Sequence, residues 1–235
     1  MANEGAGAAR FVEEVLERCE GFRSVEFFAV VDRVSTDNTW ETLQTLAAHE
    51  PRLHPVWAPE NRCVVDAYVR GYREALAAHC DWILEIDAGF SHRPQDIPQF
   101  FSKMAEGYDC VFGTRFAGGG SIETGSTFRS FVSKGGTWIT NRMLHTPLSD
   151  MTSGFELFSH DALGMVLERG IRSRGPFFQT EIKFHCRNLN VAEVPIVYQS
   201  ASRKLAAQDL SESFRILWSL YRHSGAQSAA CKNPR

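Results

Sequence analysis

The chain has 235 residues, of which 43% are hydrophobic and 23% charged; this suits one globular domain with a sizeable core. Its net charge of −3 argues against nucleic-acid binding, which needs a basic surface. No apolar run reaches the ~18–20 residues of a membrane span, and the first residues lack the pattern of a signal peptide. We therefore predict a soluble, cytoplasmic protein that does not bind nucleic acid.

The cysteines are scattered along the chain, and none has the CxxC or CxxxH spacing of a zinc site. We interpret them as reduced thiols rather than a disulfide framework. The six are Cys19, Cys63, Cys80, Cys110, Cys186 and Cys231.

The first half of the chain alternates predicted helices and strands. Residues 11–19 have helical spacing of apolar side chains and open the chain. Strands are expected at 25–31, 53–57, 82–86 and 110–114, and helices near 40–46, 64–78 and 94–103. This rhythm indicates right-handed crossovers and a mainly parallel sheet, hence an α/β fold.

The second half opens on a small-residue loop from Gly118 to Thr127, of a kind that often carries function. After it we expect a helix at 128–144 interrupted at Gly135-Gly136, strands at 155–158 and 191–198, a helix at 177–186 and a last amphipathic helix around 210–221. Residues 1–223 are predicted to form one domain and residues 224–235 a disordered tail.

The strand expected at 82–86 ends in Asp87, followed by a Ser91-His92-x-Pro94 turn that starts a helix. Ligands of open α/β sheets bind at the carboxyl ends of strands, so Asp87 is the first candidate for chemistry. The alternative is a turn or helix-capping role, which is common for aspartate.

Seven short motifs follow one another along the chain, at residues 3–4, 32–39, 87–94, 113–116, 150–155, 177–181 and 193–196. In this order they resemble family 2 glycosyltransferases of the GT-A fold, in the branch around polyprenol-phosphate (dolichol-phosphate) mannosyltransferase. The resemblance implies a Rossmann-like, mainly parallel sheet flanked by helices. It also implies sugar transfer, with inversion, from a GDP- or UDP-linked donor to a polyprenyl phosphate or similar acceptor.

By the same resemblance, Asp87 would hold Mg²⁺ or Mn²⁺ against the donor diphosphate. The implied catalytic residues are Asp87, Arg115, Gln179 and Glu181. The implied substrate-binding residues are Asn3, Glu4, Asp32, Asp37, Ser91, His92, Arg129, Lys134, Asp150, Ser202 and Lys204.

Physical chemistry supports some of these roles and offers alternatives to others. Arg115 follows a strand, and guanidinium binds phosphate through two parallel hydrogen bonds, although most arginines are simply solvated. Gln179 and Glu181 would line the acceptor side, or form an ordinary polar helix face. Arg129 and Lys134 would grip an acceptor phosphate, or flank a solvated helix. His92 would contact phosphate or metal, or serve only as a turn residue.

Three departures from the family pattern stand out. Gly89 replaces the second carboxylate of the metal motif, so a weakened metal site is expected. Arg33-Val34 replaces Asp-Gly, which weakens the case for a base pocket. The family's first strand has no counterpart before Asn3, so we expect a chain that starts late, with an open slot between the strands at 25–31 and 82–86 and unpaired backbone groups along it.

Two functions therefore stay open: an active glycosyltransferase, and a degenerate GT-A domain that binds nucleotide or sugar without efficient catalysis. A nucleotidyltransferase is disfavoured, because no glycine-rich phosphate loop with a following lysine lies near the start. The last helix, with Leu210, Phe214, Leu217, Trp218 and Tyr221, would either lie on a membrane surface as a peripheral contact or pack against the sheet.

Overall fold

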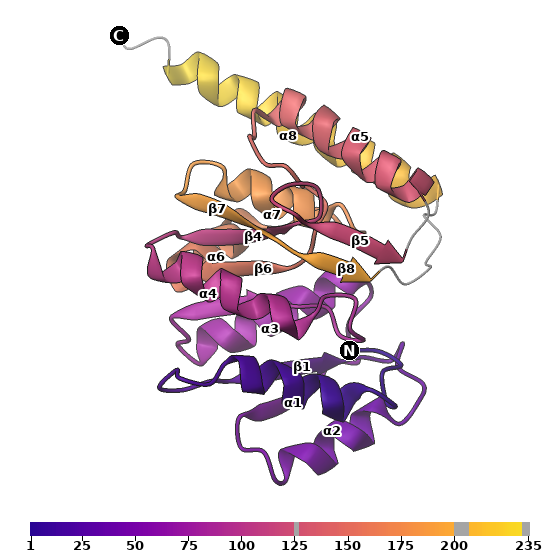
Figure 1. The fold of residues 1–235 in the computed structure, drawn as a ribbon. Helices are drawn as coiled ribbons and strands as arrows, with labels where there is room; N and C mark the ends of the chain where they lie inside the picture. Colours follow the sequence, from indigo (N-terminus) through magenta and orange to yellow (C-terminus); the bar gives the residue numbers. More distant parts are fainter. Residues whose placement is uncertain (125–126, 200–206, 232–235) are drawn as a thin grey trace.

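A computed structural model describes the backbone of residues 1–124, 127–199 and 207–231 (Figure 1), with the side chains of 124, 127–129, 207–208 and 223–231 excluded. The strands are β1 (Phe27–Val31), β2 (Leu53–Trp57), β3 (Trp82–Glu85), β4 (Cys110–Thr114), β5 (Ser121–Thr124), β6 (Glu156–Ser159), β7 (Val191–Pro195) and β8 (Val197–Gln199). The helices are α1 (Ala8–Arg18), α2 (Thr39–Ala47), α3 (Val64–Ala77), the short η1 (Pro94–Asp96), α4 (Ile97–Ala105), α5 (Thr127–Leu144), α6 (His160–Arg169), α7 (Phe178–Cys186) and α8 (Ala207–Cys231).

The central sheet has the strand order β3-β6-β4-β7. Its middle strand β4 is Cys-Val-Phe-Gly-Thr and is buried along its whole length, as the unbroken apolar run predicts. Strand β6 runs antiparallel to β3 and β4, whereas the pairs β4–β7, β1–β2 and β5–β8 are parallel. The predicted α/β class with a mainly parallel arrangement is thus confirmed, with β6 as the antiparallel exception.

The N-terminal layer is a separate two-stranded sheet covered by α1 and α2, at the bottom of Figure 1. Apolar residues from α1, α2 and both strands form one core cluster there, with Val12, Leu43 and Val31 fully buried. The apolar residues of α1 divide between two clusters: Ala8, Val12 and Leu16 pack on this sheet, whereas Phe11 and Val15 pack in the cluster of the central sheet.

Several boundaries differ from the sequence prediction. Helix α5 runs without interruption through Gly135-Gly136. The strand expected at 191–198 divides at Ile196, whose N–H bonds to the Thr114 carbonyl while the next residues pair with β5. Helix α6 was not predicted; the Ser159 side chain accepts a hydrogen bond from Ala162 N and starts it. Helix α8 continues to Cys231, beyond residue 223, where a tail was expected.

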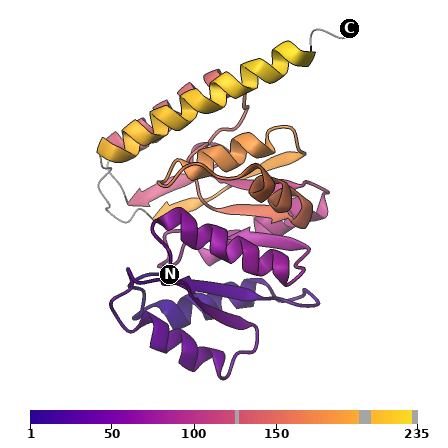
Figure 2. The same cartoon turned by 180° about the vertical axis from the view of Figure 1, so that it is seen from behind.

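Strands β1 and β3 do not pair with each other: within the described ranges β1 pairs only with β2, and β3 only with β6. Figure 2 shows the β1–β2 layer lying apart from the central sheet. Strand β3 is therefore a half-buried edge strand rather than the doubly buried strand that its apolar run predicts. Both strands line one large cavity, so the slot expected between them is present.

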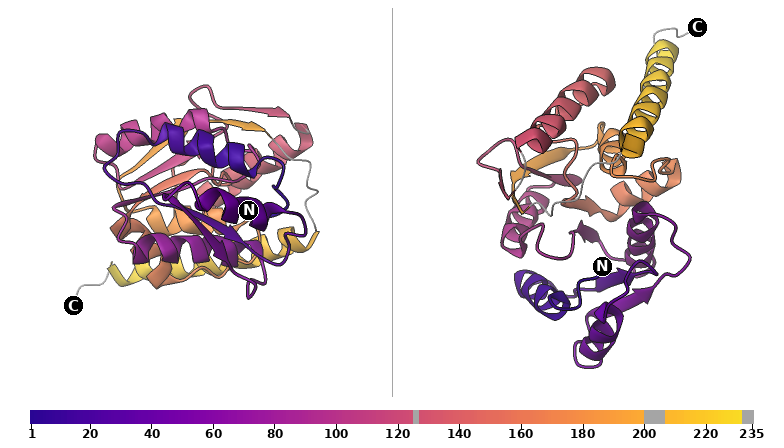
Figure 3. Two further views of the ribbon diagram at one scale, coloured as in Figure 1. Left: turned by 90° about the horizontal axis from the view of Figure 1, so that it is seen from below. Right: turned by 90° about the vertical axis from the view of Figure 1, so that its right-hand side faces the viewer.

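Helices α5 and α8 project together from the far end of the molecule (Figure 3, right). Ile216, Leu217 and Leu220 of α8 pack with Leu144 and Phe184, so α8 does contact the body of the domain. Aromatic side chains of both helices nevertheless point outward. In the part of the chain that the structure describes, we find no helix with the length and hydropathy to cross a membrane.

The slot between β1 and β3 predicts which backbone amides exchange fastest with solvent. Phe27 N–H bonds to the β2 side and His160 N–H bonds to the Asp81 carbonyl, so strand alternation turns the amides of Val30 and Leu84 toward the slot. We expect these amides to exchange at least about tenfold faster than that of Val111, which lies between two strands, because they lack a strand partner. NMR-detected exchange would measure this; equal protection of all three would contradict the slot.

Candidate active site

A cavity of about 1840 Å³ opens at the carboxyl ends of β1, β3 and β4. The residues that follow these strands, Asp32, Asp87 and Arg115, all line it, which is the edge where an α/β sheet binds ligands. The other predicted site residues that line it are Glu4, Ser91, His92 and Gln179. The fold thus gathers most of the expected donor-side residues around one space.

Asp87 is held from two sides. The Tyr68 hydroxyl donates to Asp87 Oδ1, and the Asp87 backbone N–H donates to His92 Nδ1 at 3.3 Å. Since Nδ1 accepts this bond, its proton is absent and the neutral ring is favoured; burial likewise lowers the pKa of His92. The His92 ring is 1% exposed and stacks on Phe155. His92 therefore packs beneath Asp87, and the geometry favours an orienting role.

Glu4 and Asp32 add negative charge at the same end. The Asp32 carboxylate accepts a hydrogen bond from Val34 N–H at 3.0 Å, which tightens the turn after β1. Burial raises the pKa of Glu4; the Met1 ammonium opposes this, whereas Asp37 and Asp87 add to it. Carboxylates collected in this way repel one another unless a cation lies among them.

Asn3 and Asp37 tie the N-terminal segment to the turn after β1 and do not line the cavity. Asn3 Oδ1 accepts from Thr36 N–H at 2.9 Å. Asp37 accepts from the Thr39 hydroxyl at 2.6 Å and from Gly5 N–H at 2.9 Å, and these bonds lower the pKa of Asp37 to about 2. In the structure both side chains therefore accept hydrogen bonds that hold the N-terminal segment and this turn in place.

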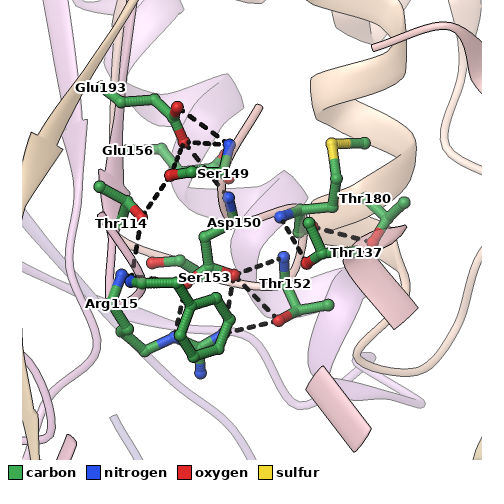
Figure 4. Close-up of polar contacts among 12 residues, drawn as sticks. Thr114, Arg115, Thr137, Ser149, Asp150, Thr152, Ser153, Glu156, Thr180 and Glu193 are labelled. Atoms are coloured by element: carbon green, nitrogen blue, oxygen red, sulfur yellow. Dashed lines mark hydrogen bonds and ion pairs between the residues drawn. The ribbon is translucent and has the colours of Figure 1, made fainter. Parts of the chain in front are cut away.

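Arg115 forms a buried fork with Asp150 (Figure 4). Its Nε and Nη2 donate to the two carboxylate oxygens at 2.7 and 2.9 Å, and Nη2 also donates to the Thr152 hydroxyl at 2.5 Å. Burial alone would raise the pKa of Asp150, but the bonds and charge of Arg115 outweigh it and the pKa is lowered. Asp150 thus orients Arg115 and leaves Nη1 as the remaining edge of the guanidinium.

The loop that carries Asp150 is fixed at several points, as Figure 4 shows. Glu193 of β7 accepts from the backbone N–H groups of Ser149 and Asp150. Thr137 of α5 accepts from Met151 N–H at 3.1 Å, and Thr180 of α7 donates to the Met151 carbonyl at 2.9 Å. Three elements therefore set the position of the fork.

A second charged group lies beneath this loop and was not found by sequence reasoning. Lys183 is 1% exposed; its Nζ lies 2.7 Å from Glu156 and donates to the Ser153 carbonyl. Glu85 is also buried and accepts from Gln179 Nε2 at 2.5 Å. Burial raises the pKa of Glu156 to about 7 despite Lys183, and it raises the pKa of Glu85 well above its ordinary value. In the sequence, the available signal for these buried groups was a charged residue within an apolar run.

Of the remaining predicted residues, the described Glu181 and Lys134 do not line the cavity. Glu181 is fully buried and accepts from the N–H groups of Arg172 and Ser173, so it holds a loop instead of lining the acceptor side. Lys134 Nζ lies over the Phe116 ring at 5.3 Å. The Arg129 side chain and residues Ser202 and Lys204 lie outside the described part of the chain.

Asp87 is suited to a hard divalent cation, because its carboxylate lies beside the cavity with an exposed fraction of 34%. In the described ranges no group of three His, Cys, Asp or Glu side chains gathers. Mg²⁺ and Mn²⁺ in nucleotide enzymes need only one or two carboxylates, since the substrate phosphates supply other ligands. The donor set therefore fits a cation shared between protein and nucleotide.

An acidic residue and an arginine face one large cavity at the carboxyl edge of the strands, which is where α/β folds of the ligand-binding kind hold their ligands. The family model described as glycosyl transferase family 2 matches residues 1–166, so the chain belongs to this family. It is 30% identical over 184 residues to the undecaprenyl-phosphate mannosyltransferase of Micrococcus luteus, covering 77% of this chain and 74% of that protein. It is 26% identical to the polyprenol monophosphomannose synthase of Mycolicibacterium smegmatis, covering 78% and 70%.

Among solved structures, glucosyl-3-phosphoglycerate synthase from Mycobacterium tuberculosis, in complex with Mn²⁺, UDP and phosphoglyceric acid, matches with a TM-score of 0.64. The match has 16% sequence identity and covers 100% of this chain and 77% of that one. The same enzyme with Mg²⁺ and UDP gives a TM-score of 0.62 at 16% identity, with 94% and 75% covered. These likenesses confirm the GT-A fold, and the family makes the protein a transferase of the polyprenol-phosphate mannosyltransferase-like branch.

The Lys183–Glu156 pair gives a stability prediction. We expect Lys183→Met to lower the free energy of unfolding by about 3–5 kcal/mol, because it leaves Glu156 buried without its cation. The double variant Lys183→Met/Glu156→Gln should recover much of this loss. The control is Lys103→Met, which breaks an exposed pair with Glu106 and should cost less than about 1 kcal/mol. Urea denaturation would measure all three; equal effects at the two lysines would refute the assignment.

Proposed function

We propose that this glycosyltransferase moves a sugar from a GDP- or UDP-linked donor to a polyprenyl phosphate, with inversion at the sugar carbon. The observation that carries the proposal is the shape of the cavity. It runs from Asp87 and Arg115 to Phe131, Leu210 and Phe214, apolar residues of α5 and α8 that are exposed at their outer faces. The lining therefore changes from charged to apolar side chains, which matches an acceptor with a phosphate head and a long apolar tail.

The donor side has the charge that a nucleoside diphosphate requires. Arg115 Nη1 is available to a phosphate oxygen while Nε and Nη2 are bound to Asp150. Asp87 would hold Mg²⁺ or Mn²⁺, which neutralises negative charge on a departing diphosphate. The solved relatives of this fold were crystallised with UDP and Mn²⁺ or Mg²⁺, which supports a donor of this kind.

The transfer itself asks little of the protein as an acid or base. An oxygen of the acceptor phosphate attacks the anomeric carbon, the bond to the diphosphate breaks on the opposite face, and the nucleoside diphosphate leaves with its electron pair. The attacking oxygen is already anionic, so no strong general base is needed. Positioning and charge neutralisation therefore supply most of the rate. Gln179 and Lys134, with Arg129, Ser202 and Lys204, are proposed to contact the acceptor side.

A second function is favoured by one observation, the glycine at position 89, which removes a carboxylate from the metal motif. On that basis the chain would bind a nucleotide or a sugar without efficient turnover. The two functions differ in one measurable property, the transfer of label from donor to lipid.

The direct test is to mix the protein with undecaprenyl phosphate and radiolabelled GDP-mannose or UDP-glucose, with Mn²⁺, and to count label in the organic phase. We expect transfer from one donor, reduced by about 100-fold in Asp87→Ala, since loss of a group that stabilises transition-state charge typically costs this much. Asp161→Ala, at an exposed position in the first turn of α6, should retain activity. Nucleotide binding without transfer would favour the second function.

The exposed aromatics of α5 and α8 are proposed to lie on the membrane that carries the acceptor. Phe131 and Trp138 of α5 are 75% and 71% exposed, and Phe214 and Trp218 of α8 are 66% and 54% exposed. Aromatic residues are favoured at a membrane surface, and exposed apolar patches on soluble domains are usually small. Peripheral contact is therefore proposed for these two helices.

Flotation with anionic liposomes tests this contact. We expect the protein to float at low salt. The variant Phe214→Ser/Trp218→Ser should stay largely at the bottom of the gradient, because it loses the apolar area that the membrane would bury. Phe22→Ser changes an exposed aromatic in the segment after α1 and should float like the parent protein. Flotation that is the same for all three proteins would rule out the α8 contact.

A further inference from the structure

The Glu4 carboxylate lies where a side chain at position 89 would lie. Gly89 has a φ of +74°, and a Cβ added there would be 2.6 and 2.8 Å from Glu4 Oε2 and Oε1. These distances are shorter than any normal contact, so position 89 can carry a side chain only if Glu4 moves. Position 89 is where the glycosyltransferase motif carries its second carboxylate. The structure thus brings a different carboxylate, from 85 residues earlier in the chain, to the place that Gly89 leaves open.

The position of Glu4 is fixed by its backbone. Its N–H donates to the Thr39 hydroxyl at 2.8 Å, and its carbonyl accepts from Gly7 and Ala8 at the start of α1. Its carboxylate, by contrast, accepts no hydrogen bond from any residue within the described ranges. A half-buried carboxylate without donors is unfavourable unless a cation approaches it.

Carboxylates and burial act in opposite directions on a positive charge at this place. Burial lowers the pKa of the Met1 ammonium, which donates to the Val30 carbonyl at 2.5 Å, whereas Asp32, Glu4 and Asp87 each raise it. Carboxylates from three different segments therefore influence a charge at this place, although no three of the described side chains gather closely enough to hold a metal by themselves. Carboxylate oxygens are the ligands that Mg²⁺ and Mn²⁺ prefer.

We propose that Glu4 is a metal ligand that replaces the carboxylate missing at Gly89, so that Glu4 and Asp87 hold the divalent cation between them. The inference rests on the proposed function in one respect, that donor phosphates would complete the ligand set. It revises the expectation of a weakened site, which counted only carboxylates within the Asp87–Gly89 motif. Gly89 is favoured here for two reasons: its φ of +74° disfavours other residues, and Glu4 would have to move to admit a side chain.

Mn²⁺ binding, measured by the EPR signal of free Mn²⁺, tests the proposal without any turnover. It is measured with the metal alone and with UDP or GDP present. We expect Glu4→Gln to weaken Mn²⁺ binding by at least about tenfold, since even indirect partners of metal ligands contribute this much. Glu13→Gln, an exposed glutamate on α1, is the matched control and should bind like the parent protein.

A swap provides a rescue. In Glu4→Ala/Gly89→Asp the carboxylate returns to position 89 and the obstructing side chain is gone; aspartate tolerates a left-handed φ better than most residues. We expect this double variant to bind Mn²⁺ within about threefold of the parent, while Glu4→Ala alone binds weakly. Thermal melting of each variant without metal shows that the fold is kept.

The outcomes separate this inference from the proposed function. Unchanged Mn²⁺ affinity in Glu4→Gln, or no Mn²⁺ binding by the parent protein in either condition, overturns the role of Glu4. Glu4-dependent Mn²⁺ binding with no response to UDP or GDP supports the metal site and overturns the proposed donor. Glu4-dependent binding that tightens with one nucleotide supports both.

Discussion

The buried fork between Arg115 and Asp150 is the interaction on which the rest of the site depends. Asp150 is fully buried, and an unpaired carboxylate there would be strongly destabilising, so its position and that of Arg115 are fixed together. The fork joins the end of β4 to the loop before β6, and Glu193, Thr137 and Thr180 tie that loop to β7, α5 and α7. The parts of the cavity wall that α5, α7 and the loop before β6 contribute are therefore positioned with this ion pair.

The cavity gains its size from the separation of β1 and β3. Because none of the described strands lies between them, the carboxyl ends of both face the same space, and Asp32 and Asp87 both line it. At the other end α5 and α8 contribute apolar side chains and project away from the sheet. The lining of the cavity thus changes from charged to apolar along its length. A charged donor would bind at the charged end, and the apolar tail of an amphipathic acceptor at the other end.

Buried charge beneath the site serves a different purpose from charge that faces the cavity. Lys183 pairs with Glu156 and donates to the Ser153 carbonyl of the Asp150–Gly154 segment. Replacing such a pair by apolar residues often costs little, whereas breaking it costs a great deal. The Lys183–Glu156 pair therefore stabilises one conformation of the loop, whereas Asp87, Glu4 and Arg115 line the cavity and are placed to contact ligands.

The sequence by itself determined the order of the elements, because apolar periodicity is local: β2 and β4 were predicted to the residue, and most helices to within a few residues. It also identified Asp87 and Arg115, since each follows an apolar run that predicts a strand. It could not find the roles of Glu181, Lys183 or Glu156, because burial of a charged side chain depends on which distant groups surround it. Likewise only the tertiary structure decided that Glu4 would meet Gly89, since a contact between residues so far apart in sequence is set by packing of the N-terminal segment against the end of β3.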